Sequence, residues 1–247
     1  TLNTQYHRHQ PIRSRHCFQA SRSSGAMGML ILNAGEIAHL DSSPNISAIS
    51  GEGMRDRDSN ISPSGLGILI QDGKFSSIND SESLQAEFAP DWDGETSSSE
   101  YTIIDAKGCA IIPGLIDSHT HLIWGGDRSS EMRLRQSGMT YREISEMGGG
   151  IRQTVSSTRL LSLDDMVLTG QSRLNAAAKY GTCAMEIKSG YGLDTDTELR
   201  LLEAAQVLSK KSEISIFPTW LGAHDFPHGK DRDQYIDELL NDQLPKV

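Results

Sequence analysis

Two histidines separated by one residue, His119 and His121, offer the clearest chemistry in this 247-residue chain. Side chains alternate between the two faces of an extended strand, so both imidazoles would point to one side and Thr120 to the other. Two nitrogen ligands at this spacing are half of a catalytic zinc or iron site. In isolation, a His-x-His pair is more often two unrelated polar residues in a loop, so the preceding residues decide between these interpretations.

The residues that precede the pair predict a β-strand that ends at the histidines. Residues 111–116 contain an apolar run of the kind found in buried parallel strands, and Pro113-Gly114 interrupts it where a barrel strand would begin. Barrels of alternating strands and helices carry their catalytic side chains at the C-terminal ends of such strands. The sequence therefore predicts that His119 and His121 stand at the catalytic end of a buried strand.

The composition argues against several classes of partner. A net charge of −10 and a pI near 5.2, without a basic face, argue against nucleic acid binding. No apolar run approaches the roughly 18 residues that a membrane span needs, so no membrane partner is expected. The three cysteines have no Cys-x-x-Cys spacing, which predicts a reducing, cytoplasmic location and a site without thiolates; they are Cys17, Cys109 and Cys183.

The N-terminal part of the chain has two segments of different composition. Residues 1–26 lack acidic side chains and carry arginines among Ser, Gln and His, which predicts a disordered tail: a targeting segment, a translated upstream region or a cloning remnant. Residues 27–110 predict a small β domain with almost no helix. Asp72-Gly73 predicts a hairpin turn, and the polar stretch 41–64 a long surface insertion. The expected strands are 29–33, 67–71, 74–78 and 101–105.

Residues 111–247 alternate between strand and helix patterns, which predicts right-handed parallel β/α winding. A closed barrel of eight strands takes about 250 residues, and this segment has room for three strands, so we expect either an incomplete copy of a larger enzyme or an open fold. The expected helices are 140–148, opened by a capping box, 162–180, opened by a second one, 195–211, capped by Thr195 to Glu198, and 232–244; the expected later strands are 182–188 and 213–217.

Several further motifs give the chain a resemblance to a known family. It resembles the imidazolonepropionases of the amidohydrolase superfamily from about residue 29 to residue 247, which is little more than the N-terminal half of a typical member. The His-x-His opening is shared across that superfamily, whereas the later motifs narrow the resemblance to this family. The motifs run from Pro113 to His121, from Gly126 to Arg128, from Gly148 to Ile151, from Glu186 to Gly192 and from Leu221 to His224.

The resemblance implies a fold and a reaction. The implied fold is a truncated (β/α)8 TIM barrel of α/β class: residues 111–247 would form its first three β/α units, and residues 27–110 the N-terminal part of a composite β-sandwich. The implied reaction is hydrolysis of the cyclic amide of imidazolone propionate to N-formimidoyl-L-glutamate in histidine degradation. The implied cofactor is one zinc or iron ion, and the full-length form would be a homodimer.

The resemblance also implies roles for five residues. His119 and His121 match two metal ligands. Arg128 matches the arginine that binds the substrate carboxylate, since a guanidinium pairs with a carboxylate through two parallel hydrogen bonds. Tyr191 and His224 match two further substrate contacts on the loops after the second and third barrel strands.

Other interpretations apply to some of these motifs. Without the resemblance, Arg128 beside Glu131 would be a weak surface ion pair. Gly148-Gly-Gly150 would end one helix with some loop mobility, or face an anion at the start of the next. Glu186 and Lys188 share one strand face, and because the family is mononuclear we interpret them as interior polar residues of the strand.

The family's remaining functional residues would lie beyond Val247. They are a third metal-binding histidine, a glutamate, a catalytic histidine and a metal-binding aspartate, so no catalytic acid or base is expected within this chain, and the chain alone is expected to be inactive. Three alternatives stay open: another amidohydrolase such as a nucleobase deaminase or a dihydroorotase, a non-catalytic partner of a full-length enzyme, and a truncated gene product without a role of its own.

Overall fold

The computed structural model describes residues 28–38, 49–94 and 100–247, which divide at residue 113 into two compact units. The tail expected over residues 1–26, Cys17 and the first part of the expected insertion lie outside the described residues. No helix within these described ranges is long and apolar enough to cross a membrane.

The first unit is built on a four-stranded sheet with the order β5-β4-β1-β6. The pairs β4–β5 and β1–β4 are antiparallel, whereas β1 and β6 run parallel. Asp72 and Gly73 connect β4 and β5 with φ values of 51° and 73°, the left-handed conformation that tight hairpins require. All four expected strands are therefore present: β1 (Gly28–Leu32), β4 (Leu66–Gln71), β5 (Lys74–Asp80) and β6 (Tyr101–Asp105).

Apolar side chains cover both faces of this sheet. Leu30 and Leu32 pack toward helix α2 (Ser81–Phe88), while Ile68 on β4 joins a second cluster with Ile37 of the short strand β2 (Ile37–Ala38). Helix α2 was not predicted from the sequence. Its signal is local, because the Asp80 carboxylate caps the helix by accepting a hydrogen bond from the Ser83 N–H at 2.9 Å.

The second half of the expected surface insertion has regular structure. It forms a 3₁₀ turn (Gly51–Arg55), helix α1 (Arg57–Asn60) and strand β3 (Ile61–Ser62), which pairs antiparallel with β2. Asp56 caps α1 through the Ser59 N–H at 3.2 Å. Residues 51–59 are exposed, as residues of a surface insertion would be, and a local cap and a strand pair give this part of the stretch regular structure.

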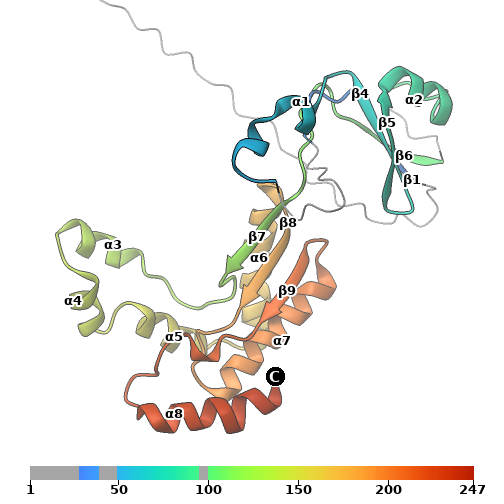
Figure 1. The fold of residues 1–247 in the computed structure, drawn as a ribbon. Helices are drawn as coiled ribbons and strands as arrows, with labels where there is room; N and C mark the ends of the chain where they lie inside the picture. Colours follow the sequence, from blue (N-terminus) through green and yellow to red (C-terminus); the bar gives the residue numbers. More distant parts are fainter. Residues whose placement is uncertain (1–27, 39–48, 95–99) are drawn as a thin grey trace, which may run out of the picture. The chain divides into compact units, whose positions relative to one another are not determined.

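The second unit contains a three-stranded parallel sheet with the order β7-β8-β9 (Figure 1). Strands β7 (Leu115–Thr120), β8 (Thr182–Lys188) and β9 (Ser215–Thr219) alternate with helices, and α6 (Leu163–Lys179) and α7 (Thr195–Lys211) cover one face. The predicted parallel pairing is confirmed. The C-terminal ends of the three strands consequently meet at one edge of the sheet.

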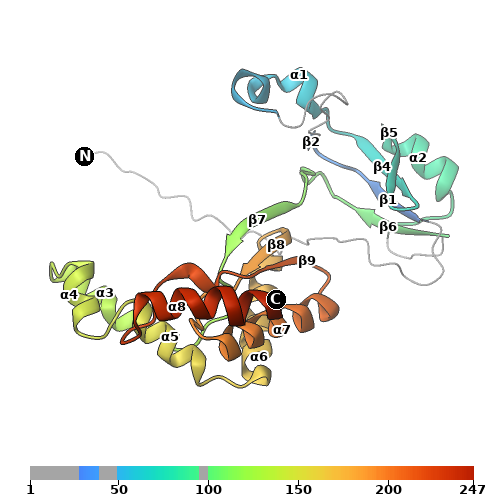
Figure 2. The ribbon, with the colours of Figure 1, turned by 60° about the horizontal axis from the view of Figure 1, so that its bottom comes forward.

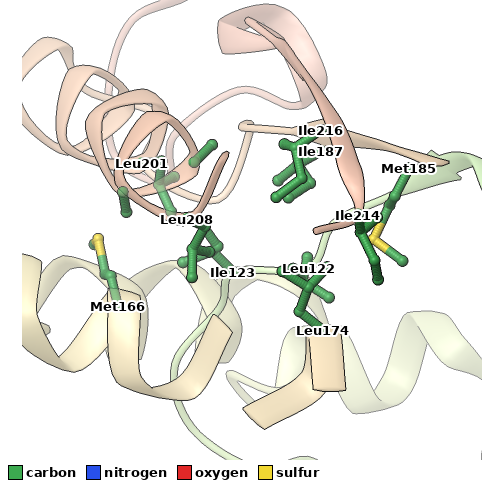
Figure 3. Packing of buried hydrophobic residues seen from close by; sticks show 12 residues of the cluster. Leu122, Ile123, Met166, Leu174, Met185, Ile187, Leu201, Leu208, Ile214 and Ile216 are labelled. Atoms are coloured by element: carbon green, nitrogen blue, oxygen red, sulfur yellow. The ribbon is translucent and has the colours of Figure 1, made fainter. Parts of the chain in front are cut away.

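An apolar core holds this sheet against its helices. Met185 and Ile187 on β8 and Ile216 on β9 point toward Leu174 of α6 and Leu208 of α7 (Figure 3). Each of these side chains is buried, and Leu208 has no exposed surface. Burial of such a side chain contributes about 1.5–3 kcal/mol, so this cluster fixes the strands on which the candidate site depends.

The opposite face of the sheet is open to solvent. Leu115 and Ile116 on β7 are 49% and 73% exposed, and Phe217 on β9 is 60% exposed. The expectation of a buried strand before the histidines is therefore wrong. β7 is an edge strand that pairs only with β8, and no element among the described residues of this unit covers the face. Ile111 does not join β7 but bridges Ile37 in the first unit.

The other helices of this unit come after β7 and after β9 in the chain (Figures 1 and 2). The two predicted capping boxes, at Thr140 and Ser162, are confirmed. Helix α7 has its expected bounds, but its cap is Asp194 and not Thr195: the Asp194 carboxylate accepts from the Thr197 N–H, and the Thr195 hydroxyl donates to Glu238. Helices α3 and α5 were not predicted from the sequence. The remaining elements are α3 (Ser129–Gln136), α4 (Tyr141–Glu146), α5 (Ile151–Arg159), a 3₁₀ turn (Gly222–His224), α8 (Arg232–Glu238), a π-helical turn (Leu239–Gln243) and a last 3₁₀ turn (Leu244–Lys246).

The core predicts a stability effect at Leu208. The change Leu208→Ala should lower the free energy of unfolding of the second unit by about 2–5 kcal/mol, because it leaves a cavity between α7, α6 and the sheet. Leu168→Ala on α6, where the side chain is 71% exposed, is the matched control and should change it by about 0.5 kcal/mol or less. Urea unfolding followed by circular dichroism measures both, and equal losses would contradict this account of the core.

Candidate active site at the C-terminal edge of the parallel sheet

The two histidines stand where β7 ends. His119 is the second-last residue of the strand and His121 follows it directly. Their ring centroids lie 6.0 Å apart with an angle of 69° between the ring planes. Thr120 points toward β8, because its hydroxyl donates to the Glu186 carbonyl oxygen at 2.6 Å. The strand thus presents two imidazoles within reach of one another.

His121 is the less exposed member of the pair. Its two ring nitrogens are buried and have no hydrogen-bond partner among the described residues. Burial lowers the pKa of His121 from 6.5 to about 4, and the neighbouring charges of His224, His119 and Lys188 add to this effect. The Ser189 backbone lies near enough to oppose the shift without a hydrogen bond of normal geometry. His121 is therefore a neutral imidazole at neutral pH.

Two more predicted residues surround His121. The ring centroids of Tyr191 and His224 each lie 4.6 Å from that of His121, and 5.7 Å from one another. Tyr191 lies on the loop after β8 and His224 on the 3₁₀ turn after β9. Burial raises the pKa of the Tyr191 phenol, so it keeps its proton. Three successive strand ends thus contribute to one aromatic and imidazole cluster.

Arg128 is the N-cap residue of α3 and is already paired. Its Nε and Nη2 atoms donate to the two carboxylate oxygens of Glu131 at 2.9 and 2.7 Å. Glu131 is buried, accepts a third hydrogen bond from the Gly150 N–H at 2.7 Å, and has its pKa lowered chiefly by Arg128. Arg128 and Tyr191 line the same cavity, which has a volume of about 480 Å³. The ion pair between Arg128 and Glu131, which was the other interpretation of this position, is therefore present. Its carboxylate is buried, so it is not a surface pair.

A second ion pair lies on the open face of the sheet. Lys188 Nζ and Glu186 Oε1 are 2.7 Å apart, and the Thr219 hydroxyl donates to the same carboxylate oxygen at 2.7 Å. These two contacts lower the pKa of Glu186, and the charge of His119 also contributes. Both side chains are partly buried on β8, as interior strand residues would be. Within the described part of the chain, no three His, Cys, Asp or Glu side chains are grouped to hold a metal ion.

The comparisons with known proteins agree with the motifs. Residues 102–184 match the Amidohydrolase family. The chain is 36% identical over 223 residues to an imidazolonepropionase from Symbiobacterium thermophilum, covering 89% of the chain and 49% of that protein. It is 38% identical over 180 residues to a probable imidazolonepropionase from Homo sapiens, covering 73% and 41%. The chain is thus similar in sequence to curated imidazolonepropionases.

The match is partial in length. The chain spans about half the length of the curated imidazolonepropionases it matches, and 35% of one from Shewanella baltica, to which it is 47% identical over 143 residues. Among solved structures, a 5-methylcytosine deaminase from Klebsiella pneumoniae matches with 16% identity and a TM-score of 0.42, covering 78% of this chain and 35% of the deaminase.

One residue that organises the site was not singled out from the sequence. Glu198 on α7 is fully buried, and its carboxylate accepts hydrogen bonds from the N–H groups of Gly190 at 2.9 Å, Gly192 at 2.7 Å and Leu193 at 2.9 Å. These donors flank Tyr191. From the sequence, residues 195–198 were expected to open the helix, and Glu198 was given no role in the site. The signal was an acidic residue one turn inside a helix that follows a glycine-rich loop.

Arg159 and Gly190 also hold this loop in its conformation. Arg159 donates to the carbonyl oxygens of Gly192 at 2.7 Å and Leu193 at 2.9 Å. Gly190 has a φ of 109°, and a Cβ there would lie 2.9 Å from the His224 Cβ atom, so only glycine fits this close approach. Donors and acceptors of the loop are thus both satisfied, which fixes Tyr191 against His121.

Loss of the Glu198 charge should loosen this loop. Glu198→Gln removes the negative charge that three N–H groups bind and places an NH₂ group where the second oxygen faces the Gly190 N–H. It should lower the free energy of unfolding by about 2–4 kcal/mol. Hydrogen exchange of the amides at 190, 192 and 193 should accelerate more than exchange in β8. Glu203→Gln, an exposed position of the same helix, is the control. Unchanged protection of these amides would contradict the assigned role.

The low pKa of His121 can be measured directly. In the metal-free protein, NMR titration of the ring carbons should place its midpoint near pH 4, against an ordinary value of 6.5. Because the unfolded state takes up this proton below pH 6.5 and the folded state does not, stability should fall as the pH drops from 6.5 toward 4. His121→Phe should weaken this dependence. A midpoint near 6.5 would contradict the burial of the ring.

Proposed function

We propose that the protein hydrolyses the cyclic amide of imidazolone propionate to N-formimidoyl-L-glutamate, the imidazolonepropionase reaction. The names of the relatives support this proposal. The observation that carries it is the convergence of His119, His121, Tyr191 and His224 at one sheet edge, with Tyr191 lining the cavity of Arg128. The fold proposed with it is the first three β/α units of a TIM barrel over 111–247, beside part of a β-sandwich over 27–110.

We propose His119 and His121 as ligands of one divalent metal ion, zinc or iron. The fit rests on His121, because its nitrogens are buried, neutral at pH 7 and without a partner. A metal ligand must be a neutral imidazole, and a buried imidazole without a hydrogen bond is otherwise costly. Such an ion, when bound, activates water as a nucleophile and polarises a carbonyl group.

The other residues of the cluster suit a planar substrate with one negative charge. The Tyr191 phenol keeps its proton and can donate a hydrogen bond to a ring oxygen or nitrogen. His224 is exposed beside it and can pack on or bond to the same ring. Arg128 supplies the cationic end of the cavity, and Glu131 fixes its orientation. These groups bind and orient, which alone contributes much of a hydrolase's rate.

Turnover by the native gene product, with variants introduced into the native gene, tests this function. Consumption of imidazolone propionate should be lost on removal of metal by a chelator and restored by zinc or ferrous iron. His119→Ala should lower kcat/KM by at least about a hundredfold, because it removes a ligand. Arg128→Gln should raise KM by about tenfold or more, through the loss of charged hydrogen bonds to the carboxylate.

A matched control separates these effects from general damage. His228→Ala changes an exposed histidine outside the cluster and should leave kcat and KM unchanged. Undiminished turnover in His119→Ala, or turnover that survives the chelator, would reject the proposed site. Turnover of a nucleobase or dihydroorotate in place of imidazolone propionate would instead assign a different hydrolase reaction to the same site.

A further inference from the structure

The cavity beside Tyr191 is lined by one face of helix α3. Arg128, Glu131, Met132 and Arg135 all contribute to its wall, and their spacing of three, four and seven residues places them on one side of the helix. Trp124 and Tyr191 face them. A volume of about 480 Å³ lies within the range of small-molecule sites, roughly 300–1,000 Å³.

Arg128 alone gives this cavity little net charge. Its Nε and Nη2 atoms, which form the edge best suited to a carboxylate, are both taken by Glu131. Glu131 is ionised, since its pKa is lowered by the guanidinium it binds. An anion entering the cavity therefore meets a neutral ion pair, in which the Nη1 atom of Arg128 has no hydrogen bond to any described residue. Desolvation of a carboxylate beside a neutral pair is costly without a further cation.

Arg135 is the cation that completes the charge balance. Its side chain is exposed, and it has no ion-pair partner within the described ranges of the chain. Its guanidinium carbon lies 5.8 Å from the centre of the Tyr141 ring, which holds it beside the cavity. Two arginines and one glutamate leave the cavity with one net positive charge.

We propose that Arg135 is a second binding residue for an anionic substrate, taking its carboxylate together with the free end of Arg128. Arg128 is held rigidly by Glu131, whereas Arg135 is an exposed side chain that can close on the anion. The identity of the substrate as imidazolone propionate rests on the proposed function. The claim that this cavity selects a carboxylate is independent of the proposed function, because binding can be measured without turnover.

The experiment compares two ligands that differ in one charge. Imidazole-4-propionate and its neutral amide are titrated into the chain of residues 1–247 at low ionic strength, with NMR to give each Kd. Arg135→Gln should weaken binding of the acid by about two- to fivefold, the scale of a lost exposed ion pair. Binding of the amide should stay unchanged, and Arg135→Lys should recover part of the affinity for the acid.

The control lies on the same helix. Arg133 is an exposed arginine of α3 that does not line the cavity, so Arg133→Gln should bind both ligands as the unaltered chain does. Equal effects of the two substitutions, an equal loss for acid and amide, or no binding of the acid by the unaltered chain would overturn the proposal. Charge-selective binding without hydrolysis of imidazolone propionate by the native gene product would keep Arg135 in this role and reject the proposed reaction.

Discussion

The candidate site depends on one buried carboxylate. Glu198 satisfies three backbone N–H groups around Tyr191, and no other acceptor among the described residues bonds to them. A buried N–H group without a partner costs about 1–3 kcal/mol, so the loop and the helix that carries Glu198 must form together. Because the hydrophobic face of α7 packs on β8 and β9, the apolar core, the carboxylate and the position of Tyr191 are linked in one chain of contacts.

Glu131 has the same relation to the other side of the site. It is buried, it accepts from the Gly150 N–H, and it fixes the guanidinium of Arg128. In both places a helix supplies an acid and a glycine-containing loop supplies N–H groups. His121, which lies against Tyr191, has no such partner among the described residues. The two carboxylates have hydrogen-bond partners and hold the loops of the site in place. The imidazole of His121 has none within the described ranges, so its nitrogens are available to a ligand.

Local signals in the sequence predicted much of the fold. The span of β8 and the capping boxes at Thr140 and Ser162 are confirmed because each is decided by neighbouring residues. Burial of the strand before His119 was wrong, since burial depends on which element covers a face, and that is not encoded in the strand itself. The apolar run predicted the strand and its parallel pairing, but it did not predict which elements would cover its faces.

The prediction of the site shows the same division. The sequence named the residues that converge at the strand ends, because β/α winding brings those ends to one edge. It did not find the contacts that orient them. Glu198 lies five to eight residues from the groups it binds, and the role of Glu131 depends on Gly150, nineteen residues away. Such contacts are set by how a helix packs beside a loop, and no short motif records that geometry.

The pairing of Arg128 with Glu131 has a consequence for specificity. A lone buried guanidinium would attract any anion, and its flexibility would be lost on each binding event. With two donors fixed by Glu131, only one end of Arg128 remains, and it points in one direction. Arg128 therefore contributes less binding energy than a free guanidinium would, but it restricts the direction from which the anion can approach. In the proposed site, further affinity for the anion has to come from a group outside this pair. The exposed Arg135, about two helical turns further along α3, is placed to supply it.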